Sequence, residues 1–225
     1  MVRGGRTFTR NLINLLSKVK QSYHYLRINS AAKSDIQWWF YGLDMFHGST
    51  PFSMDIPVPS FAFATDACLT GGAAYYNNDW FYTNWCIDLP ACKNEHINVL
   101  ELRTVLESAK RWGSQWSEKH ILVRSDNKAC VSAINKSTSR SIELLSIVKE
   151  LFWLSVQHDF QLSASFLPGK QNVLSDSISR LHCLSDANLA RELLVGKSNI
   201  LLCKNHMSTA AYIFLQELWM NDWSH

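Results

Sequence analysis

Four acidic residues in the middle of the chain, each inside a short motif, are the side chains best suited to chemistry. Asp66 lies in FAFATDA, Glu101 in HINVLELRTVL, Asp126 in ILVRSDNKA and Asp176 in LPGKQNVLSDSISRL. Carboxylates are the ligands that hard divalent cations prefer, and two such cations can clamp a phosphodiester during hydrolysis. The four acids therefore predict a metal site, provided that the fold brings them together.

Each acid also has a purely structural explanation. Asp66 can be a turn residue, Asp126 can cap the helix after it, and Asp176 can form an i,i+4 ion pair with Arg180. Glu101 lies beside an apolar stripe with no basic residue three or four positions further on, and a buried charge is rarely left unpaired unless it binds an ion. Taken together, four converging like charges need cations, which favours metal binding.

The pattern around these acids predicts the elements that position them. Phe61–Asp66 alternates like a strand, and the turn signals Gly71-Gly72 and Asn77-Asn78-Asp79 divide the region into a three-stranded meander. Apolar periodicity then predicts helices over 97–112, 126–136 with Asp126 or Asn127 as its cap, 141–157 and 172–181, with strands at HILVRS and FQLSASFLP. The order βββαβααβα indicates an α/β fold, a five-stranded mixed sheet flanked by helices. Asp66 and Asp126 end neighbouring strands, where sites of α/β sheets gather.

Charge and composition divide the chain into three regions. Residues 1–58 form a basic, helical connection segment; its first 34 residues carry +7 and no acid, leaving −4 for the remainder. We expect a helix within 9–29, a second helix capped by Ser34 or Asp35, and a proline-rich linker over 47–60, with the domain boundary near 55–60. Residues 59–182 form the α/β domain, and residues 183–225 a helical tail. The basic segment can grip phosphate, be a solvated helix face, or be an organelle transit peptide.

Composition also excludes some classes of protein. Hydrophobic residues make up 47% and charged residues 18% of the chain, which is typical of a packed globular protein. No apolar run approaches the roughly 20 residues of a membrane span. The six cysteines form no CxxC pair, which favours reduced thiols and an intracellular location, cytoplasmic or nuclear.

Four motifs together, TDACLTGGAA, HINVLELRTVLESAKRW, LVRSDNKACVSAIN and SFLPGKQNVLSDSISRL, resemble the ribonuclease H domain of DIRS-like and gypsy-like retroelement reverse transcriptases. The resemblance covers about residues 60–182, and PGKQNVLSDSISR is its most specific part. It implies a ribonuclease H-like fold that hydrolyses the RNA strand of an RNA–DNA hybrid with two Mg²⁺ ions, or Mn²⁺. Asp66, Glu101, Asp126 and Asp176 would then be the catalytic residues and metal ligands, one ion activating water and the other stabilising the leaving oxygen.

The resemblance also implies how nucleic acid is held. Gly72, Asn127, Lys128 and Lys170 would contact it, and the 2′-hydroxyls of the minor groove would identify RNA. Two departures bear on activity: Phe166 stands where the family often has a histidine, and no basic protrusion separates Lys136 from Ile142. Phosphate contacts would then come from the N-terminal segment or from a polymerase domain, in cis or in trans.

Two other functions remain open at this point. One is a catalytically weak or inactive ribonuclease H-like module that binds nucleic acid, which Phe166 and the lack of room for a polymerase domain before Asp66 favour. The other is a different nuclease on the same fold, against which PGKQNVLSD argues.

Overall fold

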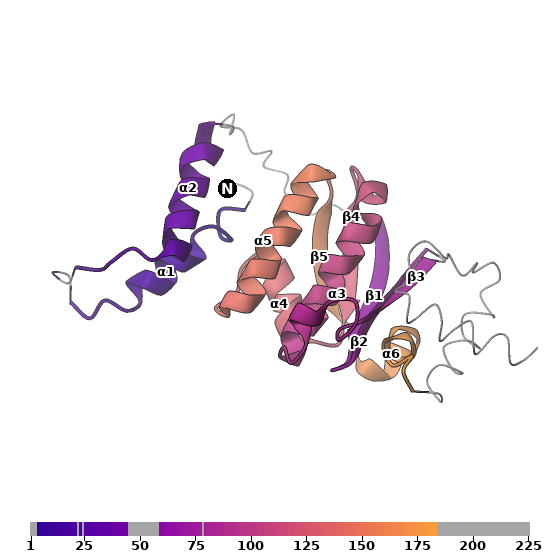
Figure 1. The fold of residues 1–225 in the computed structure, drawn as a ribbon. Coiled ribbons are helices and arrows are strands. Elements are labelled where there is room, and N and C mark those ends of the chain that lie inside the picture. The colour runs from indigo at the N-terminus through magenta and orange to yellow at the C-terminus, as the bar shows by residue number, and fades with distance from the viewer. Residues whose placement is uncertain (1–3, 22, 24, 45–58, 78, 184–225) are drawn as a thin grey trace, which may run out of the picture.

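The structure, a computed structural model, describes residues 4–21, 23, 25–44, 59–77 and 79–183 (Figure 1). The predicted linker at 47–60 lies mostly outside these residues, and the predicted tail almost entirely. The helices are α1 Arg10–Leu16, α2 Ser30–Asp44, α3 Ile97–Trp112, α4 Lys128–Lys136, α5 Ile142–Gln157 and α6 Val173–Ser179. The strands are β1 Phe61–Ala67, β2 Gly71–Tyr76, β3 Asp79–Asn84, β4 His120–Ser125 and β5 Gln161–Phe166.

The five strands form one mixed sheet in the order β3-β2-β1-β4-β5. β1, β2 and β3 pair antiparallel as a meander, whereas β1, β4 and β5 run parallel. This arrangement confirms the predicted fold class, an α/β fold with a five-stranded mixed sheet and the element order βββαβααβα. Because Ala64 lies opposite Arg124 in the β1–β4 pair, Asp66 and Asp126 come to the same edge of the sheet.

Helices cover both faces of the sheet, and two successive glycines of β2 show how closely they approach. A Cβ at Gly72 would lie 2.4 Å from Thr104 Oγ1 on α3, while a Cβ at Gly71 would lie 2.7 Å from the Ser179 carbonyl oxygen at the end of α6. Successive strand residues point to opposite faces. Therefore α3 and α6 lie on opposite sides of the sheet, and α3 packs beside α5 (Figure 1).

The core between the sheet and α3 is rich in aromatic side chains. Trp112 and Trp116 are fully buried against Phe63 and Tyr76 of the strands, with Phe160 edge-on to Trp116. This packing fixes the rotation of α3 about its axis, and so fixes which of its residues face the edge that carries Asp66.

The structure of the N-terminal segment differs from two sequence predictions. The first helix ends at Leu16 rather than continuing towards residue 29, and no residue of α1 is buried. Helices gain most of their stability from packing, so the apolar spacing beyond Leu16 has no surface to support it. The second helix begins at Ser30, and neither Ser34 nor Asp35 is its cap. Asp35 is instead completely buried inside the helix.

This segment packs on the side of the domain formed by α5 and the end of α4 (Figure 1). The ring of Phe8 stacks on Trp38 with centroids 4.2 Å apart and meets Phe152 of α5 edge-on at 5.3 Å. Asp35 accepts hydrogen bonds from Asn11 and forms an ion pair with Lys149 of α5. The described part of the segment is thus fastened to the domain by aromatic and ionic contacts.

Among the described residues, no helix combines the length and the apolar character that crossing a bilayer requires. The five described cysteines are all free thiols.

Candidate metal centre

Three of the four predicted acids meet at the carboxyl ends of the parallel strands. Asp66, Glu101 and Asp126 each offer one carboxylate oxygen, and these oxygens lie within 4.8 Å of one another. Asp66 lies near the end of β1, Asp126 directly follows β4, and Glu101 projects from the second turn of α3. Three oxygen ligands at this separation suit a hard divalent cation.

Glu101 is the most deeply buried of the three. Its exposure is 3%, and its Oε2 has no hydrogen-bond partner within the described residues. Burial, followed by the nearby charges of Asp66 and Asp126, raises the pKa of Glu101 to about 9. A buried carboxylate oxygen without a donor is costly, and a bound cation would supply the missing partner.

Asp66 is buried as well, but it has a donor. Burial raises the pKa of Asp66 to about 7, opposed by a hydrogen bond from the Ser179 hydroxyl, 2.7 Å from Oδ2. Asp126 is more exposed, and its pKa is raised mainly by burial and also by the charge of Asp176. The three carboxyls therefore hold protons more tightly than isolated acids do, and a cation that binds them must displace those protons.

Asp176 lies near this cluster, but its carboxylate is paired with Arg180. Its Oδ1 lies 2.7 Å from Arg180 Nη2 and accepts a hydrogen bond of 2.9 Å from Arg180 Nε. Its charge still acts on Asp66 and Asp126, raising the pKa of both. The structure thus brings together three of the predicted ligands and leaves the fourth beside them in an ion pair.

The predicted nucleic-acid-binding residues have different surroundings. The Asn127 side chain caps α4 by accepting from the amides of Ala129 and Cys130, and it donates to Asn98 of α3 at 2.8 Å. Lys128 is exposed, with its ammonium 5.4 Å from the centre of the Phe166 ring. Asn127 therefore ties α3 to α4 beside the acids, while Lys128 keeps its charge at the surface.

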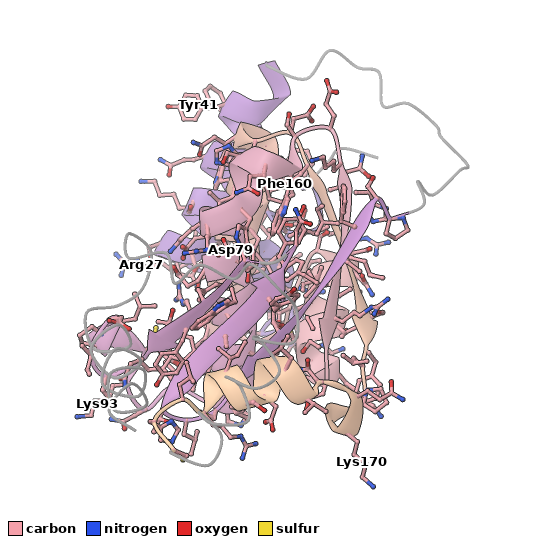
Figure 2. All side chains as sticks on the ribbon, turned by 90° about the vertical axis from the view of Figure 1, so that its right-hand side faces the viewer. Arg27, Tyr41, Asp79, Lys93, Phe160 and Lys170 are labelled. Atoms are coloured by element: carbon pink, nitrogen blue, oxygen red, sulfur yellow. The ribbon has the colours of Figure 1, made fainter. Side chains whose placement is uncertain are left out.

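The other two predicted contact residues also differ in exposure. Gly72 is buried, where any side chain would collide with Trp85 and Thr104. Lys170 projects from the short turn before α6 (Figure 2). The neighbouring Gly169 is so close that a Cβ there would lie 3.0 Å from Asp126 Oδ2. This turn therefore passes beside Asp126, and Lys170 lies next to the residue that makes this approach.

Two residues that were not predicted as site residues hold the cluster in place. The Ser179 hydroxyl binds Asp66, and the buried Asn172 donates from Nδ2 to the Thr65 carbonyl oxygen at 2.9 Å. Together with Ser175, which donates to the Ala64 carbonyl oxygen, they fasten α6 to β1. The sequence does contain a signal for them. Asn172, Ser175 and Ser179 recur every three or four residues, on one side of the short helix that also carries Asp176.

Fold and site together define an α/β protein with a carboxylate cluster at the carboxyl edge of its parallel strands. No model of a protein family matches the sequence, and no curated protein matches it. Among solved structures, ribonuclease H1 from Halobacterium salinarum is similar at 10% identity and a TM-score of 0.42, covering 53% of this chain and 94% of that one.

Two further solved structures are similar. LC11-RNase H1 in complex with an RNA/DNA hybrid shares 14% identity, with a TM-score of 0.41 over 56% of this chain and 98% of that one. The prototype foamy virus protease–reverse transcriptase shares 12% identity, with a TM-score of 0.33 over 76% of this chain and 23% of that one. Similarities of this strength carry no argument about activity, which has to come from the site.

Proposed function

We propose that this protein is a metal-dependent endonuclease that hydrolyses the RNA strand of RNA–DNA hybrids. The observation that carries the proposal is the cluster of Asp66, Glu101 and Asp126, whose oxygens lie within 4.8 Å of one another and include a buried oxygen without a donor. The motif resemblance described above selects the hybrid as substrate. It also suggests that the chain derives from a retroelement reverse transcriptase.

The donor set fits Mg²⁺ or Mn²⁺, since all of its ligand atoms are carboxylate oxygens. Asp66, Glu101 and Asp126 would hold the ions, with Asp176 as a fourth ligand once it is released from Arg180. Bound divalent ions supply activation of water and charge neutralisation at the leaving oxygen. The hydrolysis adds water to phosphorus and breaks the bond to the 3′ oxygen, which leaves a 5′-phosphate and a 3′-hydroxyl.

The ion pair of Asp176 is a weak obstacle to this role. Its side chains are about half exposed, at 41% for Asp176 and 49% for Arg180. Exposed pairs contribute only about 0–1 kcal/mol, so a divalent ion beside Asp66 can outcompete the guanidinium for this carboxylate. Arg180 is then free to meet a phosphate oxygen.

Lys128, Lys170 and the backbone around Asn127 are the contacts that we assign to the hybrid near the cluster. Both lysines are exposed, and both lie within two residues of a group at the cluster: Lys128 follows Asp126, and Lys170 follows Gly169. Gly72 is buried, so we expect it to act through the packing of α3 on β2. A polymerase domain, in cis or in trans, would add further contacts.

The test is a cleavage assay on an RNA-labelled hybrid with Mg²⁺ or Mn²⁺. Asp126→Asn should lower cleavage by more than about 100-fold, because losing a ligand costs more than the 10–100-fold typical of losing a ligand's support. The matched control is Asp159→Asn, at an exposed position before β5 whose φ of 49° asparagine tolerates. Cleavage that survives Asp126→Asn, or no cleavage with either ion, refutes the proposal.

The second candidate is a hybrid-binding module with little or no catalytic activity. The pairing of Asp176 with Arg180 and the exposed Phe166 at the end of β5 favour it. Binding of the hybrid in both metals without cleavage supports this candidate, whereas cleavage of plain duplex DNA supports a different nuclease on the same fold.

A further inference from the structure

A second charged feature lies outside the carboxylate cluster. Basic side chains continue from α4 across the following loop to the N-terminal segment, and we refer to this set as the basic track. Its members are Lys128, Lys136, Arg140, Arg6 and Arg10. All are exposed except Arg10, which is half-buried.

The first part of the basic track is a row along α4. Lys128, Ser132 and Lys136 are spaced four residues apart, which places them on one side of a helix. At about 1.5 Å per residue, the two lysines are separated by about 12 Å along the axis. Residues 127–141 contain three basic side chains and no acid, so the row is positive throughout and starts two residues from Asp126.

The second part is held against the end of this row by specific contacts. The Thr7 hydroxyl donates to the carbonyl oxygen of Ser137, the residue that caps α4, at 2.7 Å. Arg10 Nε donates to the Thr138 hydroxyl at 3.1 Å. Phe8 is held between Trp38 and Phe152. Arg6 and Arg10 are therefore fixed next to the end of α4, where Lys136 and Arg140 lie.

The charges of the basic track are uncompensated, in contrast to those elsewhere. Within the described part of the chain, none of its five side chains forms an ion pair, whereas Arg103, Lys110 and Arg111 of α3 each pair with an acid. Asp35, the first acid in the sequence, is buried and engaged by Lys149. Unpaired like charges on one surface repel each other and attract a polyanion.

We propose that the basic track binds the phosphate backbone of a nucleic-acid duplex and leads the duplex to the carboxylate cluster. A row of about 12 Å spans three to four phosphates of one strand at about 3.4 Å of axial rise each. One end of the basic track lies beside Asp126. We therefore infer that the ligand is nucleic acid rather than another polyanion, because a phosphodiester is the anion on which a carboxylate-bound cation acts. In this respect the inference rests on the proposed function.

Binding to a short labelled RNA–DNA hybrid tests the track separately from cleavage. Affinity of the full chain is measured in EDTA by fluorescence anisotropy between about 50 and 200 mM KCl, where each phosphate contact contributes about 0.9 to the slope of log K against log [salt]. Lys136→Gln/Arg140→Gln should lower the slope by about 2, and Arg6→Gln should lower it by about 1. The control Lys93→Gln/Lys110→Gln removes two exposed charges outside the track and should leave the slope unchanged.

The outcomes separate the two proposals. Slopes of the track variants equal to that of the control overturn the basic track, even when the wild-type protein cleaves the hybrid. Reduced slopes together with no cleavage in Mg²⁺ or Mn²⁺ support the track and refute the endonuclease. Binding of the wild-type protein to anionic lipid vesicles but not to the hybrid also overturns the track. Circular dichroism confirms that each exposed substitution leaves the fold intact.

Discussion

Glu101 provides the sharpest test of the metal centre, because the same burial that suits a cation penalises the metal-free protein. Its carboxyl has an ordinary pKa of 4.5 and a folded-state pKa of about 9. Between these values the folded state binds more protons than the unfolded state, so the unfolding free energy falls as pH rises. Below pH 4.5 both states are protonated and the penalty disappears.

The size of the penalty follows from the two pKa values. The pH of 7.5 is three units above the unfolded-state pKa of Glu101. Taking up a proton at Glu101 on folding therefore costs about 4 kcal/mol at this pH, at 1.36 kcal/mol per unit. At pH 5.5 the cost is about 1 kcal/mol on the same basis. Glu101→Gln is neutral in both states, so we expect it to stabilise the metal-free protein by up to about 4 kcal/mol at pH 7.5 and by much less at pH 5.5.

The assay is urea unfolding in EDTA at both pH values, followed by titration with Mg²⁺. The ion should stabilise the wild-type protein, since it binds only the folded state, and should not stabilise Glu101→Gln. The matched control is Glu107→Gln on the same helix, which loses only the ion pair with Lys110 and should cost about 0.2–0.5 kcal/mol. A Glu101→Gln protein that is less stable than wild type at pH 7.5, with no difference between the two pH values, refutes this reasoning.

Two other substitutions test the contacts that hold the site and the N-terminal segment. Ser179→Ala removes the hydrogen bond to Asp66 and should raise the half-saturating Mg²⁺ concentration by about 10-fold, measured by thermal stabilisation. The control is Ser177→Ala, which loses only a hydrogen bond within its own helix. Equal effects of the two substitutions contradict the prediction. Asp35→Ala leaves Lys149 without its buried partner and should lower the unfolding free energy by about 3 kcal/mol. Urea unfolding measures this loss, and a loss below about 0.5 kcal/mol would match an exposed pair instead.

Much of the α/β domain could be predicted because local signals and packing agree there. The apolar stripe that predicted a helix over 97–112 is the face that α3 buries, and its bounds are those expected. Three of the four acids converge as predicted, because parallel pairing of β1 and β4 follows from the order of strands and helices. In such a sheet the topology itself determines which residues meet at the carboxyl edge.

The N-terminal segment could not be predicted in the same way, because distant residues decide its structure. Asp35 is typical of a helix cap in sequence, but it lies inside α2 because Lys149, 114 residues away, compensates its charge. The partner of Asp176 was among the alternatives, since Arg180 lies one helical turn on. Whether Asp176 contacts Arg180 or a metal ion depends on whether the ion is bound. The sequence spacing of Asp176 and Arg180 is the same in both cases, so it does not distinguish them.

The contact between Thr7 and Ser137 has a consequence for the synthesis of the chain. The two residues are separated by 130 positions, and ribosomes add about 5–20 residues per second. The N-terminal segment therefore leaves the ribosome roughly 6–26 s before the end of α4 that it will contact. During this interval Phe8 and Trp38 have no α5 against which to pack, so a chaperone has time to bind them. A chain truncated before α5 would leave these aromatic side chains without that partner.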